Sequence, residues 1–394
     1  MSDSKKLYMV ICDLDPVAYL PEGKKTLVFG SPIYEHTYRK IKDASNKLGL
    51  DVEFVRASAC EIPNTKTSIT PSFDDIVIFA SPLAFLASGK DIEGAIDYVV
   101  KCDVGYSTVG SLRSLYLAVG QGKMLTEGEI TSCAGFVARM NESGAKTYPS
   151  HFADSEKSVP TTKLEFYKKI DTYRHEMLDY LIMSGVEIES RDGIVVSPVT
   201  EIHRGVKLLT GSVIKDGSKI GDNAVIGPNT TIEGSEIGEG AQVIQSTIVN
   251  STIEHNAKVG PYSQLTDKCH ILTEAIVGAF CELRGTTIST GSIISSHCVL
   301  SYTDVERRCL IGSGVVTVDF EGKSKDRRVK IGMGAVVGSN STLISPINIG
   351  MNAFVGAGST ITDDVPQGAL GIAREFQSNH DGWASRNKKK GENY

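Results

Sequence analysis

A six-residue repeat in the C-terminal half constrains the fold of this 394-residue chain more than any other feature. From about residue 206 the sequence can be written in sixes, among them SKIGDN, AVIGPN, AIVGAF, VKIGMG and AFVGAG. The third residue is Ile, Val or Leu, and the next is often Gly. This period predicts three short strands per turn of a triangular parallel coil, with the aliphatic residue filling its interior. We expect the Gly to permit a tight corner by taking a positive φ. A chance run in a β-sandwich is disfavoured by the length of the match.

One excursion interrupts the repeat between Gly314 and Val329. Its sequence, VVTVDFEGKSKDRR, is polar and basic and is too long for a corner turn. Loops that project from a solenoid are frequent places for binding sites, so this segment is a candidate part of a site. A disordered insertion is the alternative.

The N-terminal region has the pattern of an α/β fold. Apolar runs predict strands, and amphipathic stretches between them predict helices, which together favour a parallel sheet covered by helices. The expected strands are Leu7–Ile11, Val52–Val55 and Asp75–Ala80, and the expected helices are Tyr34–Leu48 and Asp91–Val100. A further helix is predicted over Thr161–Met183, ending near Gly185.

These patterns predict an α/β N-terminal domain followed by a parallel β-helix. The expected divisions are an α/β domain over 1–160, a linker helix and connection over 161–200, the β-helix over 201–373 and a basic tail over 374–394.

Composition narrows the class of function. The net charge of −6 gives no global attraction to nucleic acid or to an anionic membrane. No run is long and apolar enough to span a bilayer, and the N-terminus lacks the apolar stretch of a signal peptide. The eight cysteines form no CxxC pair, which favours reduced thiols and a cytoplasmic protein.

Several landmarks in the C-terminal half together resemble one family. They are Met183–Val186, Ser251–Ile253, Val259–Tyr262, Ile311–Gly314, Val337–Ser341 and the closing segment ALGIAREFQSNHDGW at Ala369–Trp383. Over about Tyr173–Lys390 the chain resembles the bifunctional N-acetylglucosamine-1-phosphate uridyltransferase/glucosamine-1-phosphate acetyltransferase family. The resemblance implies a left-handed β-helix, a homotrimer and a role in making UDP-N-acetylglucosamine.

The N-terminal domain resembles the family's nucleotidyltransferase domain only faintly. Gly30–His36 is similar to its strand-to-helix step, but Ile11–Tyr19 has no glycine where the family has its glycine-rich phosphate loop. Ala80 stands where the family has a metal-binding Asp. Without a phosphate-binding loop or a carboxylate to hold magnesium, the negative charge of the phosphates during phosphoryl transfer would be uncompensated. We therefore expect this domain to be degenerate and uridyltransfer to be lost.

The resemblance implies an acetyl-CoA site. Small residues whose backbone lines the family's CoA groove correspond to Ser313, Ser339 and Ala357, and the Arg that meets the CoA phosphates corresponds to Arg374. Arg386 and Lys388–Lys390 could add to it. A surface Arg without this role is the alternative for Arg374.

The acceptor side departs from the family. An ungapped alignment places Ser296 at the general-base His, with His297 one residue away. Arg284 and Lys325 keep cations that could hold a phosphate, and Asp319 and Phe320 stand for the family's Asn-Tyr pair. The family's remaining contacts to the sugar phosphate correspond to Thr266, Val299 and Leu310. A corner histidine facing solvent is the alternative for His297.

Three hypotheses for function follow from this. The first is an acetyl-CoA-dependent N-acyltransferase acting on an amino-sugar phosphate or a related acceptor. The second is a non-catalytic trimeric scaffold or regulator, and the third, least supported, is a surviving nucleotidyltransferase. No metal site is expected, because His255, His270 and His297 are too evenly dispersed for the three-histidine zinc site of hexapeptide-repeat carbonic anhydrases.

Overall fold

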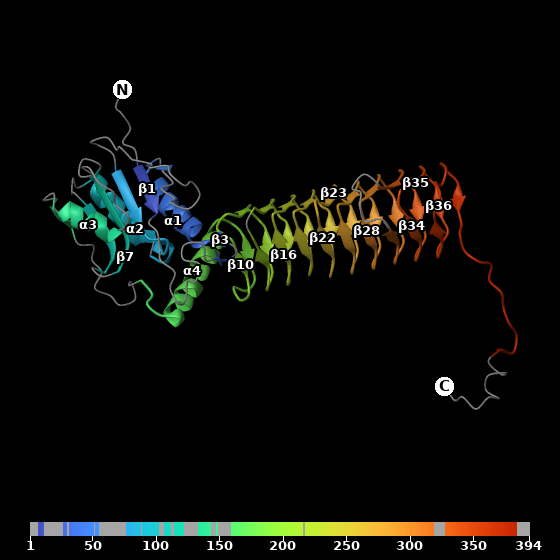
Figure 1. Ribbon diagram of the computed structural model, residues 1–394, viewed down its shortest axis with the longest axis horizontal. Helices are drawn as coiled ribbons and strands as arrows, with labels where there is room; N and C mark the ends of the chain where they lie inside the picture. The colour runs from blue at the N-terminus through green and yellow to red at the C-terminus, as the bar shows by residue number, and fades with distance from the viewer. Residues whose placement is uncertain are drawn as a thin grey trace, which may run out of the picture. The chain divides into compact units, whose positions relative to one another are not determined.

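The structure is a computed structural model, and it describes most of the chain from residue 7 to residue 383 (Figure 1). The described residues are 7–11, 27–29, 31–50, 52–54, 76–87, 89–101, 106–111, 114–121, 133–142, 147–148, 159–215, 217–318 and 328–383. The chain divides into two compact units, one of residues 1–220 with 231–234 and one of residues 221–230 with 235–394. The domain divisions expected from the sequence stay predictions.

The first unit contains a six-stranded sheet with the order β4-β1-β5-β7-β6-β8. Its strands are β1 (Leu7–Ile11), β4 (Val52–Phe54), β5 (Ile76–Ala80), β6 (Tyr106–Ser111), β7 (Ser114–Gln121) and β8 (Thr147–Tyr148). A small hairpin pairs β2 (Leu27–Val28) with β3 (Ser31–Pro32). The helices are α1 (Ile33–Lys47), α2 (Gly89–Lys101) and α3 (Cys133–Glu142), with a short 3-10 turn, η2, at Ala84–Leu86.

The predicted strands and helices of this region are confirmed, but the predicted parallel sheet is only partly right. Strand β1 runs parallel to β4 and β5, whereas β7 is antiparallel to both β5 and β6. The reason is local: β6 and β7 are separated by only two residues, and so short a connection can join only antiparallel strands.

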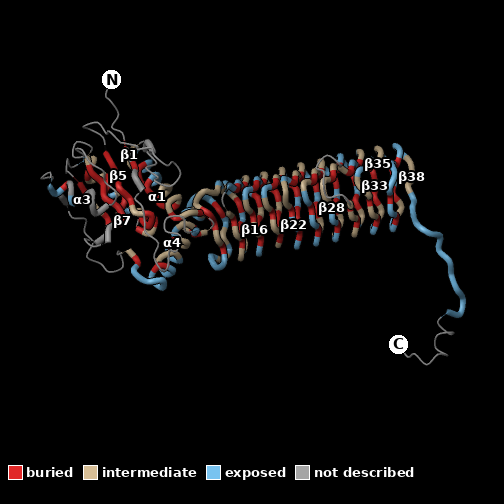
Figure 2. The backbone as a smooth tube through the Cα atoms, in the orientation of Figure 1, coloured by how far each residue is buried: buried red, intermediate tan, exposed pale blue. Residues whose placement is uncertain are grey.

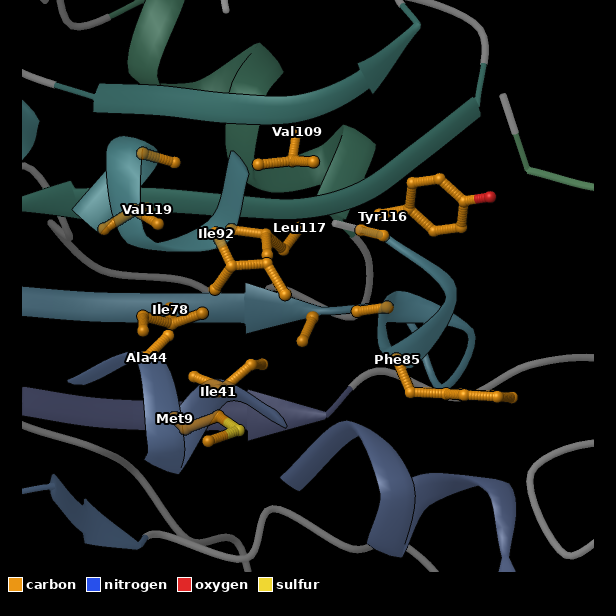
Figure 3. Close-up of a cluster of buried hydrophobic side chains, with 14 of the residues drawn as sticks. Met9, Ile41, Ala44, Ile78, Phe85, Ile92, Val109, Tyr116, Leu117 and Val119 are labelled. Carbon is orange, nitrogen blue, oxygen red and sulfur yellow. The ribbon is translucent and has the colours of Figure 1, made fainter. Parts of the chain in front are cut away.

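The core of this unit lies around the central strand β5, all five residues of which are buried. Figure 3 shows Ile41 and Ala44 of α1 near Met9 and Ile78 of the sheet. Helix α2 contributes Ile92 to the same cluster. This core requires helices and sheet together, because neither could bury its apolar face alone.

Helix α4 (Lys163–Met183) confirms the predicted helix and joins this core through Phe166 and Tyr173. Its start is capped reciprocally. Thr162 Oγ1 accepts from Glu165 N at 3.3 Å, and the Glu165 carboxylate accepts from Thr161 N at 2.9 Å. Gly185 follows the helix with a φ of 99°, as expected of a glycine at a helix C-terminus.

From Glu187 to Gly371 the described chain is a left-handed parallel β-helix of three sheets, which confirms the predicted fold class. Sheet I contains β9 (Glu187–Ile188), β12 (Lys207–Leu208), β15 (Val225–Ile226), β18 (Gln242–Val243), β21 (Lys258–Val259), β24 (Ile276–Val277), β27 (Ile293–Ile294), β30 (Leu310–Ile311), β33 (Val336–Val337), β36 (Phe354–Val355) and β38 (Leu370–Gly371).

Each coil then contributes one strand to sheet II and one to sheet III. Sheet II contains β10 (Val195–Val196), β13 (Val213–Ile214), β16 (Thr231–Glu233), β19 (Thr247–Val249), β22 (Gln264–Thr266), β25 (Glu282–Arg284), β28 (Val299–Ser301), β31 (Val316–Val318), β34 (Thr342–Ile344) and β37 (Thr360–Ile361). Sheet III contains β11 (Glu201–Ile202), β14 (Lys219–Ile220), β17 (Glu236–Ile237), β20 (Thr252–Ile253), β23 (His270–Ile271), β26 (Thr287–Ile288), β29 (Thr303–Val305), β32 (Val329–Ile331) and β35 (Ile347–Ile349).

The interior of the β-helix is filled as the repeat predicts. Strand residues alternate outward and inward, so the first residue of a strand such as β24 is exposed and the second is buried. Figure 2 shows this alternation of buried and less buried residues along the coils. The repeat also continues further than expected, because β31 extends to Val318 before the excursion begins.

The predicted role of the repeat glycine is wrong at most corners. Gly312 and Gly338 do not have a positive φ, and they are needed for a different reason. A Cβ on Gly338 would lie 2.5 Å from Ala357 N, so the backbone of the next coil excludes a side chain there. The positive φ falls two residues later, for example at Gly314 and Asn340. At Gly260, where φ is 109°, both requirements coincide.

Within the described residues, no helix combines the length and the apolar character that crossing a membrane would need.

Candidate functional site

The corner between sheets I and II brings together four of the residues selected from the sequence. Ser296, Ser313, Ser339 and Ala357 occupy the same position on four successive coils. Backbone hydrogen bonds fix this register, since Gly314 N donates to Ser296 O at 3.1 Å, Asn340 N to Ser313 O at 2.8 Å and Gly358 N to Ser339 O at 2.8 Å. We refer to these four residues as the corner column.

The corner column is an open edge of small side chains. Ser313, Ser339 and Ala357 are exposed, and Ser296 is half-buried. Gly312 and Gly338, which precede Ser313 and Ser339, bring adjacent coils into close backbone contact, as described above. An extended ligand could therefore lie along this edge against main-chain atoms with little steric hindrance.

Arg374 leaves the last coil at the same corner. Ala373, directly before it, donates its N–H to Ser359 Oγ at 3.2 Å and accepts at its carbonyl from Thr360 N at 3.2 Å. Ser359 lies two residues after Ala357 on the same corner, so the structure places Arg374 beside the end of the corner column. The side chain is exposed. It is thus available to an anionic ligand, and Arg is well suited to bind phosphate.

His297 directly follows Ser296 and faces solvent at this corner with a φ of 62°. Its ring stacks on Phe280, with centroids 5.0 Å apart and ring planes 2° from parallel. Phe280 in turn stacks on Tyr262 at 5.0 Å. We call Tyr262, Phe280 and His297 the aromatic ladder. The stack on Phe280 positions the His297 ring.

The aromatic ladder was missed by sequence reasoning, although its signal was present. The three rings are 18 and 17 residues apart, which is one coil at each step, so residues in register stack on neighbouring coils. His297 is therefore held at the corner by stacking on Phe280. Whether it also acts as a base stays a prediction.

Arg284 lies at the corner between sheets II and III, away from the corner column. It ends β25, and its partner in the neighbouring strand is Ser301. From His297 to Ser301 the chain runs four residues, or roughly 13 Å of extended strand. The structure therefore separates this predicted phosphate contact from the candidate base by about the length of a strand.

Arg284 already has partners within the chain. Its Nε lies 3.5 Å from Asp267 Oδ2, and its guanidinium carbon lies 5.7 Å from the centre of the Tyr302 ring. Tyr302 donates its hydroxyl to Asp267 at 2.7 Å, and this bond raises the pKa of Tyr302. The Arg284 side chain is 60% exposed, so an anionic ligand would compete with Asp267 for an accessible guanidinium.

Lys325, Asp319 and Phe320 lie outside the described residues, as do Arg386 and Lys388–Lys390 of the tail. Their predicted roles stay predictions.

The three histidines weighed for zinc do not converge. His270 lies on sheet III, where its Nε2 is 2.8 Å from Glu254 Oε1, and His255 lies at the corner between sheets III and I. His297 lies at a different corner. Among the residues that the structure describes, no group of three metal-binding side chains is present.

In the first unit, the strand-to-helix step at Ser31–His36 has the predicted local form, with β3 leading into α1. Its histidine is buried. His36 Nε2 lies 2.7 Å from Val28 O, and its Nδ1 lies 3.2 Å from the Tyr173 hydroxyl of α4. Ala80, at the position of the family's metal-binding Asp, is fully buried at the end of β5. Of Ile11–Tyr19, only Ile11 is described.

Comparison with known proteins agrees with this architecture. The family described as "Bacterial transferase hexapeptide (six repeats)" matches residues 200–234, and "Hexapeptide repeat of succinyl-transferase" matches residues 328–363. The β-helix is therefore that of a hexapeptide-repeat protein.

Within that class, the similar curated sequences are those of the bifunctional protein GlmU. The chain is 38% identical to GlmU of Thermoanaerobacter pseudethanolicus over 224 residues, which are 57% of this chain and 48% of that protein. It is 35% identical to GlmU of Thermus thermophilus over 203 residues, covering 51% and 45%. The family resemblance predicted from the sequence is confirmed. The chain spans about half the length of these two relatives or slightly less.

Solved structures resemble the chain less closely. LpxA from Acinetobacter baumannii is 18% identical with a TM-score of 0.31, covering 51% of this chain and 77% of that one.

Proposed function

We propose that this protein is an acyl-CoA-dependent acyltransferase that holds its donor along the corner column. The observation that carries the proposal is the alignment of Ser296, Ser313, Ser339 and Ala357 on successive coils, with Arg374 beside their end. The exposed edge suits the extended arm of acetyl-CoA, and the Arg374 guanidinium suits its phosphates. The similarity to bifunctional GlmU proteins over this region supports the same assignment.

The proposed reaction transfers the acyl group to an amine. The amine nitrogen attacks the thioester carbon, the carbon–sulfur bond breaks, and CoA leaves as the thiol. The ammonium must first lose a proton to a base, and a backbone or side-chain donor must stabilise the oxyanion. His297 is the better base of the two candidates, because the hydroxyl of Ser296 is a poor base at neutral pH.

We infer that the acceptor is an amino-sugar phosphate or a related amine. Arg284 and Lys325 supply the cations for such a phosphate in this proposal. In this proposal the acceptor is bound through different contacts from those of the family. Thr266, Val299 and Leu310 cannot make the charged, phenolic and amide contacts that the family resemblance implies at these positions.

The role of His297 as the base is tested by measuring the turnover of wild type and of His297→Ala with candidate amino-sugar phosphates. We expect about a hundredfold loss of turnover or more, with acetyl-CoA affinity nearly unchanged. His255→Ala removes another exposed corner histidine and should leave turnover intact. Equal turnover of His297→Ala and wild type would refute this role.

A second candidate is a non-catalytic scaffold that keeps the donor groove. Two observations favour it: His297 is stacked within the aromatic ladder, and Arg284 is paired with Asp267. The same screen separates the two candidates. Tight acetyl-CoA binding without turnover on any acceptor, and with no effect of His297→Ala, supports the scaffold.

We also propose that uridyltransfer is lost. The apolar, buried Ala80 offers no carboxylate for magnesium at the end of β5. No release of pyrophosphate is expected from UTP and N-acetylglucosamine-1-phosphate with magnesium, and robust release would show this proposal to be wrong.

We propose that the chain forms a homotrimer through sheet I. From β24 onward, the outward position of this sheet is apolar. Ile276 is 38%, Ile293 41%, Leu310 44%, Phe354 51% and Leu370 62% exposed, and Val336 between them is partly buried. On earlier strands the same position is polar or charged at Glu187, Lys207, Gln242 and Lys258, and apolar at Val225. We call the five apolar residues the sheet I stripe. A contiguous exposed stripe of this kind is typical of a protein interface.

A further inference from the structure

Two cysteines lie side by side at the corner between sheets I and II. Cys281 and Cys298 come directly before β25 and β28, whose register pairs Glu282 with Val299. The cysteines therefore face each other one step earlier, and Glu282 N donates to Cys298 O at 2.9 Å. Both side chains are buried and both thiols are free. Adjacent strands are about 4.8 Å apart, which falls within the Cα separation of about 4.4–6.8 Å that a disulfide needs.

We propose that Cys281 and Cys298 form a dithiol modification site, which hydrogen peroxide and related hydroperoxides oxidise to a disulfide between adjacent coils.

The surroundings make the two sulfurs chemically different. In its thiol form Cys281 donates to Ser295 O at 3.1 Å, and Cys298 donates to Gly312 O at 3.2 Å. When Cys281 ionises, the Cys298 thiol, the Ser263 hydroxyl and the backbone N–H groups of His297 and Cys298 can stabilise the sulfur. The hydrogen bond from the Cys298 thiol is the largest of these influences, and together they lower the pKa of Cys281 to about 7. The same bond raises the pKa of Cys298.

The other two buried cysteines of the β-helix show what burial alone does. Burial raises the pKa of Cys269 and of Cys309. Cys269 occupies the corner position that Ser251 occupies one coil earlier, and its N–H donates to the Ser251 hydroxyl. Cys309 is related to Ser292 in the same way, and its N–H donates to the Ser292 hydroxyl. Each therefore stacks on a serine, so they serve as internal controls for the paired cysteines.

The oxidation balances without a bound cofactor. The Cys281 thiolate attacks one peroxide oxygen, the O–O bond breaks, and the departing hydroxide takes a proton to become water. Cys298 then loses its proton and attacks the sulfur of the resulting sulfenic acid. The S–O bond breaks, a second water forms, and the two sulfurs are joined. Two thiols are oxidised by two electrons, and one peroxide is reduced to two waters.

Thiol mapping on the full chain tests the proposal. Wild-type protein is treated with hydrogen peroxide, denatured, alkylated with iodoacetamide, and cut with trypsin and Glu-C. The cut after Glu274 separates Cys269 from Cys281, so a linked peptide identifies the pair without ambiguity. We expect Cys281 and Cys298 to become linked together, faster as the pH rises through 7, while Cys269 and Cys309 remain alkylated.

Matched variants sharpen the result. Cys309→Ser should leave the linkage unchanged, and Cys298→Ser should stop at the sulfenic acid of Cys281, which dimedone traps. Where a variant fails to fold, phenylarsine oxide on wild type replaces it, because trivalent arsenic bridges two close thiols and should protect both from alkylation. The proposal is overturned if Cys281 and Cys298 stay reduced at peroxide concentrations that fully oxidise glutathione, or if Cys269 or Cys309 reacts first.

The expected effect of this disulfide on acetyl-CoA binding rests on the proposed function. Cys298 follows His297 and lies beside the corner column, so a link between coils should weaken acetyl-CoA binding. Thiol mapping does not depend on that outcome. Failure of CoA binding in the reduced protein would remove the proposed function and leave the dithiol site standing.

Discussion

Backbone contact between coils determines which residues the corner between sheets I and II accepts. At Gly338, an added Cβ would lie 2.5 Å from Ala357 N and 2.7 Å from Val355 O, both backbone atoms that cannot rotate away. We expect Gly338→Ala to destabilise the β-helix by about 1–3 kcal/mol, as overpacking generally does. Denaturant unfolding followed by circular dichroism measures the loss.

Gly94→Ala provides the control for this experiment. It lies within α2 with open space around its Cβ, so alanine should be neutral or slightly stabilising there. Equal stability of Gly338→Ala and wild type would mean that adjacent coils do not approach as closely as the structure has them.

The sequence predicts the residues of the corner column, but their physical surroundings come from the structure. The family resemblance selects Ser313, Ser339 and Ala357, and the backbone hydrogen bonds between coils show that these residues occupy equivalent positions. The excursion between Gly314 and Val329 and the shortened steps change how many residues each coil contains. For this reason the stack of His297 on Phe280 was not expected, nor was the pairing of Arg284 with Asp267.

At the scale of elements, side-chain hydrogen bonds connect neighbouring coils at a corner of sheet III where Glu254, rather than a glycine, follows the strand. Glu254, which follows β20, accepts from His270 Nε2 at 2.8 Å, from Thr273 N at 3.1 Å and from Thr273 Oγ1 at 3.0 Å. Partial burial opposes ionisation of this carboxyl, but the hydrogen bonds outweigh it and lower the pKa of Glu254. A carboxylate in this position thus links two coils.

The sign of the pH effect follows from the lowered pKa. Stability from Glu254 is present above its unfolded-state pKa, near the ordinary glutamate value of about 4.3, and is lost as the pH falls through the lower folded-state pKa. We expect Glu254→Gln to lower stability at pH 7 by about 1 kcal/mol. The difference from wild type should shrink below about pH 4. Melting curves at several pH values check this, and a difference that grows on acidification would contradict it.

Elements formed by local sequence patterns were predicted well, and those that depend on pairing were not. Strand β1 and helices α1 and α2 follow from apolar runs and amphipathic spacing within single segments. The antiparallel placement of β7 between β5 and β6 depends on a short connection and on partners distant in sequence. Hydrophobic periodicity alone does not specify such partners.

At the scale of the whole molecule, the sheet I stripe is the surface that assembly would bury. Phe354→Glu places a charge at a residue that is 51% exposed in the single chain, so the fold should survive while association is lost. Sedimentation velocity at micromolar concentration should show a trimer for wild type and monomers for the variant. Lys258→Glu changes the same outward position on an earlier strand and should remain trimeric. A monomeric wild type would contradict the proposed assembly.

Acetyl-CoA binding measured by calorimetry tests the central claim that the corner column holds an acyl donor. We predict that wild type binds and that Arg374→Ala binds about ten- to a hundredfold more weakly, because a charge-assisted contact contributes about 1.5–3 kcal/mol. Ala357→Trp should also block binding by filling the exposed edge, whereas His255→Ala, at another corner, should bind as wild type does. No binding to wild type, or undiminished binding to both Arg374→Ala and Ala357→Trp, would contradict the account.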